Sequence, residues 1–87
     1  MDKKEIERKV REILADRLDT TIDKVLPSSR LIDDLGMDSM KAIEVMFELK
    51  DILLIDVADN DFMKVKTVAD VVKLIEFYIG EHNNDQC

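Results

Sequence analysis

The chain of 87 residues has few residues that break helices, since it contains only two glycines and one proline. A sheet with many tight turns needs more of both, so this scarcity favours helices joined by few loops. Tryptophan is absent, and aromatic residues make up 5% of the chain. The small core of a single domain of this length must therefore consist mainly of leucine, isoleucine, valine and methionine.

The single cysteine, Cys87, is the last residue, so an internal disulfide bond is excluded. The sequence has no Cys-x-x-Cys pair or Cys/His cluster for zinc, and a terminal cysteine does not fit a prenylation box. No apolar run reaches membrane-spanning length, and the charged residues 2–5 do not resemble a signal peptide. We therefore expect a cytoplasmic protein without stable membrane insertion.

Negative charge is concentrated in the middle of the chain. The net charge is −7, and residues 33–61 hold nine acids against two bases, while acids and bases balance in the remainder. Nucleic acid is not an expected partner, because phosphate binding favours a basic surface. The acidic middle is either a docking surface for basic partners or a face that keeps the protein soluble.

Hydrophobic periodicity predicts a first helix over about residues 3–18, where Asp2 and Glu5 have the spacing of a capping box. Residues 19–38 have no long periodic run, and Pro27 prevents a continuous helix there. We expect a long loop with a short helical turn near residues 21–25. Scattered apolar side chains would anchor this loop across the core: Ile22, Val25, Leu26, Leu31, Ile32 and Leu35.

The helical pattern returns from Ser39 to about Leu54. One face of this segment is a candidate core face, formed by Ala42, Val45, Met46, Leu49 and Leu53. A second face mixes acids with large apolar side chains: Met40, Glu44, Phe47, Glu48 and Asp51. This mixture is typical of either a broad core stripe or a recognition surface. The apolar run that follows, residues 52–57, fits a helix end or a short strand.

Two more helices complete an all-α prediction. Residues 59–63 can form a short turn that carries Phe62 and Met63 inward. Thr67 and Asp70 form a second candidate capping box before a last helix, and Gly80 is a candidate terminator. This pattern predicts a domain over residues 1–80 and a flexible polar C-terminal tail over residues 81–87.

Ser39 is the residue best placed for chemistry, but the sequence does not support catalysis by it. The only histidine, His82, lies in the predicted tail, and residues 36–40 lack the spacing of a nucleophile elbow. The acidic loop does not match a calcium loop, so we expect no metal site. Two roles fit a serine at a helix start: an N-cap, shared as a candidate with Asp38, or a site for a phosphate ester.

The segment Asp34-Leu35-Gly36-Met37-Asp38-Ser39-Met40, followed by Ile43-Glu44-Val45, resembles the attachment motif of acyl carrier proteins, D-L-G-x-D-S-L and then V-E-L. The resemblance extends over most of the chain. It implies a four-helix bundle with a long loop between helices 1 and 2 and a short third helix. It also implies that Ser39, within a motif that includes Asp38, receives 4′-phosphopantetheine from coenzyme A through a separate magnesium-dependent transferase. The arm would carry acyl groups as thioesters, and the chain itself would not be an enzyme.

The same resemblance makes the second helix the main recognition helix. The implied partners are a phosphopantetheinyl transferase, an acyl-ACP synthetase, a ketosynthase and an acyltransferase, and we expect a monomer. The residues that would contact these partners are Met40, Lys41, Glu44, Phe47, Glu48 and Asp51. The acyl chain would fold back between helices, against Ile43, Met46, Phe62 and Val65.

The sequence departs from the common fatty-acid pattern at four places. Met40 replaces a leucine, Lys41 stands where an acid is frequent, residues 52–55 are apolar where acids are usual, and Phe62 and Met63 add bulk to the short third helix. These departures favour a specialised acyl, polyketide or lipid-modifying pathway over the housekeeping fatty-acid role. A peptidyl or aminoacyl carrier and a non-covalent helical adaptor remain as alternatives.

Overall fold

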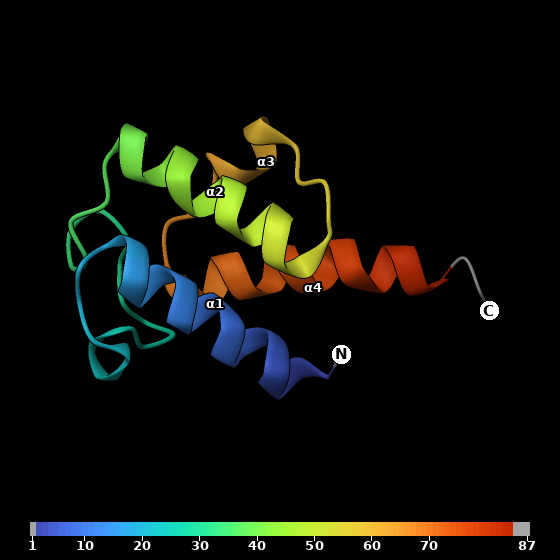
Figure 1. The fold of residues 1–87 in the computed structure, drawn as a ribbon, viewed down its shortest axis with the longest axis horizontal. Coiled ribbons are helices and arrows are strands. Elements are labelled where there is room, and N and C mark those ends of the chain that lie inside the picture. Colours follow the sequence, from blue (N-terminus) through green and yellow to red (C-terminus); the bar gives the residue numbers. More distant parts are fainter. Residues whose placement is uncertain (1, 85–87) are drawn as a thin grey trace.

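The computed structural model describes residues 2–84, and these residues form an all-α bundle (Figure 1). No strand is present among them beyond one isolated bridge between Arg30 and Thr67. The elements are four α-helices and one 3-10 turn: α1 (Lys3–Arg17), η1 (Ile22–Lys24), α2 (Ser39–Leu53), α3 (Asp59–Phe62) and α4 (Val68–Asn84). The predicted fold class, long first loop and short third helix are confirmed.

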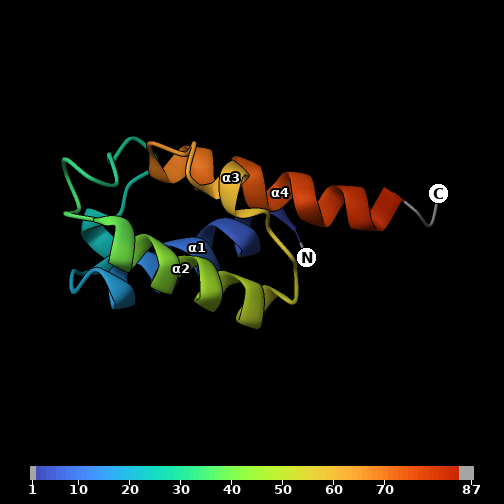
Figure 2. The ribbon, with the colours of Figure 1, turned by 90° about the horizontal axis from the view of Figure 1, so that it is seen from above.

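The helix α1 packs against both α2 and α4, while α3 packs against α4. Figures 1 and 2 show that α1 runs opposite to α2 and α4, and that the long loop gathers at the end where α2 begins. All five residues of the candidate core face of α2 are buried, as predicted. They share one core with the buried side chains of α1, including the fully buried Val10 and Leu14.

Polar contacts to backbone atoms fix the first helix and the start of the loop. The Asp2 carboxylate accepts the Glu5 N–H at 2.8 Å, which confirms the predicted cap. From the middle of α1, the Arg11 side chain donates to the carbonyl oxygens of Val25 at 2.8 Å and Ile22 at 3.1 Å. The short helical turn predicted here is η1, and Arg11 ties it to the bundle.

Backbone hydrogen bonds also join the loop to the start of α4. The Leu31 N–H donates to the Lys66 carbonyl, and the Val68 N–H donates to the Ser29 carbonyl. Val25 and Leu31 are fully buried, as expected of anchors. The predictions for Leu26 and Ile32 were wrong, because these side chains are 49% and 67% exposed. Neighbouring residues in a turn point in different directions, and Val25 and Leu31 occupy the inward positions.

The apolar run after α2 is a helix end and not a strand. Leu54 is its C-cap and adopts the left-handed conformation, with φ 55° and ψ 45°. The N–H groups of Leu54 and Ile55 both donate to the Lys50 carbonyl, which ends the helix in the manner usual for a left-handed cap. The Leu54 side chain is 87% exposed, so it does not contribute to the core.

In α3, Phe62 is buried as predicted, whereas Met63 is 54% exposed and its predicted inward position was wrong. A single helical turn presents one position to the core, and Phe62 occupies it. The capping box of α4 is confirmed, since Thr67 and Asp70 exchange two hydrogen bonds of 3.2 Å. The predicted end at Gly80 was wrong, because α4 continues to Asn84. The rest of the predicted tail, including Cys87, lies outside the described residues.

Candidate functional site

Ser39 is the first residue of α2, at the point where the long loop becomes helical. Asp38 is the N-cap: its backbone is extended, and its carboxylate accepts the Lys41 N–H at 2.8 Å. The sequence left the cap open between these two residues, and the structure assigns it to Asp38. The Ser39 side chain is exposed, and its hydroxyl is engaged in no hydrogen bond with the described residues.

The loop before Ser39 is held in a defined conformation. Gly36 has φ 71°, a conformation that glycine adopts without strain, and its N–H donates to the Ile32 carbonyl. The next residue, Met37, is buried and donates its N–H to the Leu31 carbonyl. Met37 therefore anchors the chain directly before Asp38 and fixes the position at which α2 begins.

Asp34 stabilises the same loop through its carboxylate. This group accepts the Arg30 N–H at 2.8 Å and lies 3.5 Å from the Arg30 Nε. The hydrogen bond from the backbone N–H is the main reason that the pKa of Asp34 is lowered, and the charge of Arg30 contributes in the same direction. The first residue of the D-L-G-x-D-S segment thus has a structural role some distance from the serine hydroxyl.

The surroundings of Ser39 suit a phosphate ester. The first turn of a helix leaves backbone N–H groups, here those of Ser39 and Met40, without an acceptor inside the helix. Those groups and the positive end of the helix dipole favour a negative charge at this position. Because the Ser39 hydroxyl is exposed, a long group attached to it can extend into solvent. The residues present therefore fit a covalently attached phosphopantetheine arm.

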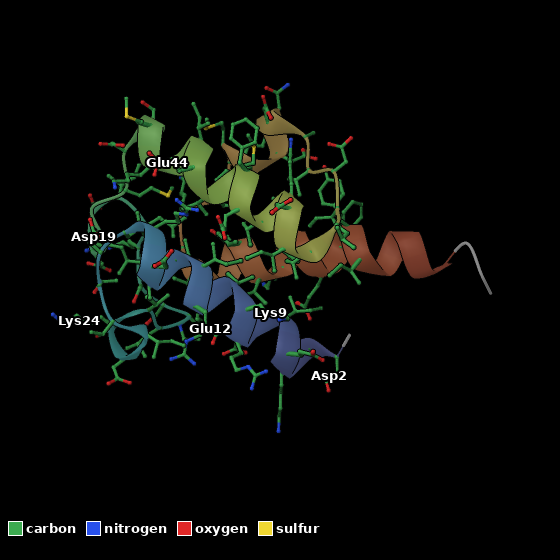
Figure 3. The ribbon with its side chains drawn as sticks, in the orientation of Figure 1. Asp2, Lys9, Glu12, Asp19, Lys24 and Glu44 are labelled. Atoms are coloured by element: carbon green, nitrogen blue, oxygen red, sulfur yellow. The ribbon has the colours of Figure 1, made fainter. Side chains whose placement is uncertain are left out.

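The outer face of α2 remains open beyond Ser39. Met40 is 70% exposed and Phe47 is 61% exposed, so neither belongs to a broadened core stripe. Asp51 is also exposed, while Lys41 and Glu44 are half-buried, and Glu44 is visible on the first half of α2 (Figure 3). This face combines large apolar side chains with acids, which is the composition of a recognition surface.

Glu48 differs from the other acids of this face, because it forms an ion pair with Arg17 of α1. The hydrogen bond from Arg17 to Glu48 is the main reason that the pKa of Arg17 is raised. Together with three neighbours on α2 the pair lines a hollow of about 470 Å³, formed by Arg17, Glu44, Phe47, Glu48 and Asp51. Arg17 was not among the residues predicted for this face, since nothing in the local sequence pattern of α1 distinguishes it from other surface charges.

Lys50 provides a further positive charge near this face, in addition to Lys41 and Arg17. Its Nζ lies 5.9 Å from the centroid of the Phe47 ring, within range of a cation–π contact. The same atom lies 3.7 Å from an Asp56 oxygen and 3.9 Å from an Asp59 oxygen. Lys50 therefore connects α2 to the segment that contains α3, and it offsets part of the local negative charge.

The four candidates for contact with an acyl chain lie in different environments. Met46 and Phe62 are buried in the shared core, and Val65 is packed against it. Ile43 is 42% exposed, so it lies at the rim and not inside. Contact of these residues with an acyl chain stays a prediction.

A family model described as "Phosphopantetheine attachment site" matches residues 8–75 of the chain. A curated acyl carrier protein of Rickettsia bellii is 39% identical over 79 residues, which cover 91% of this chain and 87% of the relative. The fold resembles a solved candidate acyl carrier protein from Mycobacterium tuberculosis, with a TM-score of 0.78, 29% identity, and coverage of 84% of this chain and 97% of the other. The solved acyl carrier protein from Enterococcus faecalis gives a TM-score of 0.74 at 31% identity, covering 90% and 99%.

These findings define the class of the protein as a small helical domain with a phosphopantetheine attachment site. The chain belongs to the acyl carrier protein family. Its cofactor is covalently attached 4′-phosphopantetheine, and members of the family are carriers and not catalysts. Within the described part of the chain, no helix is both long and apolar enough to cross a membrane. No group of three or more metal-binding side chains was found among the same residues.

Proposed function

We propose that Ser39 is the residue that carries the phosphopantetheine arm, and that the chain holds acyl groups as thioesters while partner enzymes act on them. One observation supports this proposal above the others. Asp38 caps α2, so the exposed Ser39 hydroxyl has no structural task in the described residues. A serine fixed in position by the loop but free at its hydroxyl is suited to modification by another enzyme.

In the modification the Ser39 oxygen would form a bond to the phosphorus atom that, in coenzyme A, bears the pantetheine arm. The bond from that phosphorus to the rest of coenzyme A breaks, so that the nucleotide part leaves, and a base on the transferase takes the serine proton. This chain would contribute the position of the hydroxyl and the favourable field of the α2 N-terminus. The thiol of the attached arm then supplies the thioester chemistry.

The partners that we propose are a phosphopantetheinyl transferase and enzymes that load, extend or transfer the acyl group, such as an acyl-ACP synthetase, a ketosynthase and an acyltransferase. Their surfaces are expected to be basic and to contact the outer face of α2, where Glu44 and Asp51 flank the exposed Phe47. We also propose a specialised acyl, polyketide or lipid-modifying pathway. The positive charge of Lys41 beside Ser39 and the exposed apolar Leu54 support that choice, because they change the surface on which partners discriminate.

The test is incubation of the purified chain with coenzyme A, magnesium and a broad-specificity transferase, followed by mass spectrometry. We expect the mass of one phosphopantetheine group to be added and to map to Ser39. The matched control is Ser39→Ala, which should take up nothing. An unchanged mass in the folded wild type, or addition in the Ser39→Ala variant, would contradict the assignment.

A further inference from the structure

The hydroxyl of Tyr78 on α4 joins two points of α3. It accepts the N–H of Ala58 at 3.1 Å and donates to the carboxylate of Asp61 at 2.6 Å. Ala58 is the N-cap of α3, and Asp61 is the third residue of that helix. In a capping box the side chain of the third residue reaches the N-cap N–H directly. Here a phenol from another helix bridges these two groups, and we call this arrangement the Tyr78 relay.

The relay compensates for the weakness of α3 itself. This helix has four residues, and its N-cap, an alanine, provides no side-chain hydrogen bond. A single turn has little stability in isolation, because nucleation of a helix is unfavourable. Contacts with other elements therefore fix the position of α3. They include the burial of its Phe62 side chain in the core, the contact of Lys50 with Asp59, and the Tyr78 relay.

The same helix lies over the core that an acyl chain would have to enter. Phe62 of α3 is 1% exposed, and Val57 directly before α3 is also 1% exposed. Protein interiors are close-packed, so an acyl chain needs room that the resting core provides only if some element moves. A short helix that relies on its neighbours is the element expected to move at the lowest cost.

We propose that the Tyr78 relay limits how far α3 can move from α4, and that Tyr78 thereby determines which acyl chains the core accepts. This inference rests on the proposed function, because it presupposes an acyl group on Ser39. It assigns to Tyr78 a positioning role and no direct contact with the reacting thioester. A short acyl chain would fit with the relay intact, whereas a long acyl chain would require the hydrogen bonds of the relay to break.

The first experiment uses the unmodified protein and the variant Tyr78→Phe. This variant keeps the ring, whose edge-to-face contact with Phe77 has a centroid distance of 5.7 Å, and removes only the hydroxyl. We expect the Phe62 and Met63 amides to exchange with deuterium about tenfold faster, since a hydrogen bond to a charged group contributes a factor of this order. The amide of Val10 in α1 should exchange at the wild-type rate.

Three further variants distinguish the loss of the Tyr78 relay from a general loss of negative charge near α3. Asp61→Ala should accelerate the same amides, and the double variant should be at most about twofold faster than either single one, because both break one relay. The matched control is Asp56→Asn, which alters a fully exposed acid beside α3 that lies outside the relay. Unchanged amide exchange in Tyr78→Phe, or equal acceleration by Asp56→Asn, would contradict the role of the Tyr78 relay in holding α3.

The second experiment compares hexanoyl and myristoyl thioesters of the modified protein by thermal unfolding. A chain that binds in the folded core raises the midpoint. We expect Tyr78→Phe to increase the gain from the myristoyl chain more than the gain from the hexanoyl chain. Equal gains in wild type and variant would overturn the role in chain selection. Failure to modify Ser39 would instead contradict the proposed function, and the exchange result would still report on the relay.

Discussion

The Arg17 guanidinium on α1 forms an ion pair with the Glu48 carboxylate on α2, so one acid of the predicted docking face already has a partner within the chain. Glu44, one helical turn before Glu48, has no such ion pair among the described residues. The two glutamates share a hollow but differ in the charge that they offer to a basic partner. Their contributions to partner encounter should therefore be unequal.

We predict that Glu44→Gln slows association with the phosphopantetheinyl transferase by about threefold at low salt, because complementary charge mainly raises the association rate. Glu48→Gln should have a smaller effect, since Arg17 already offsets that carboxylate. Stopped-flow association rates at low and high salt will measure both, and the difference should shrink as salt screens the charges. Arg17→Gln is the reciprocal control and should accelerate association. Equal slowing by the two glutamate variants would contradict the prediction.

The core faces could be predicted from the sequence because they follow from helical period alone. Ala42, Val45 and Leu49 recur along one side of α2, and each is buried. The end of α4 could not be predicted in this way. A glycine in a helix interior costs only about 1 kcal/mol relative to alanine, so Gly80 does not force a stop. The helix accordingly continues through Gly80 to Asn84.

The candidate site was predictable where it depends on local spacing and unpredictable where it depends on long-range contacts. The position of Ser39 at a helix start follows from residues 36–41. The Arg17–Glu48 pair joins residues 31 apart, and the bond from Tyr78 to Asp61 joins residues 17 apart. Neither pair has a signature within one helical turn. Only the packing of α1 on α2 and of α3 on α4 brings these side chains together.

The assignment of the α2 cap gives a prediction about stability. Asp38→Ala should lower the free energy of unfolding by about 1 kcal/mol, because it removes the acceptor of the Lys41 N–H. Ser39→Ala should change it by less than about 0.5 kcal/mol, as is usual for an exposed side chain outside such features. Urea unfolding of the unmodified proteins measures both values. A larger loss for Ser39→Ala than for Asp38→Ala would move the cap to Ser39.

Asp70 should make the stability of the protein depend on acid pH. Its carboxylate accepts N–H groups of Lys66 at 3.0 Å and Thr67 at 3.2 Å, and these hydrogen bonds lower its pKa in the folded state. A carboxylate whose pKa is lowered by folding stabilises the protein at pH values above its pKa in the unfolded chain, which is about 3.9. This stabilisation is lost as the pH falls through the lower pKa of the folded state. Urea unfolding should therefore show wild type more stable than Asp70→Asn at about pH 6, with a smaller gap at about pH 3. A constant gap would exclude this linkage.

Leu54 should be a site where the protein can be stabilised without loss of phosphopantetheine uptake at Ser39. A non-glycine residue in the left-handed region is strained by contacts of its side chain, and Leu54 recovers little by burial because it is 87% exposed. Leu54→Gly should therefore raise the free energy of unfolding by about 0.5 to 1 kcal/mol, allowing for the greater freedom of glycine in the unfolded chain. Leu54→Ala is the matched control: it also removes the exposed side chain but retains the strain, so it should give no comparable gain. Both variants should accept phosphopantetheine at the wild-type rate, since Leu54 and Ser39 lie at opposite ends of α2. A gain equal in the two variants would show that the exposed apolar side chain, and not the backbone conformation, is the source of instability.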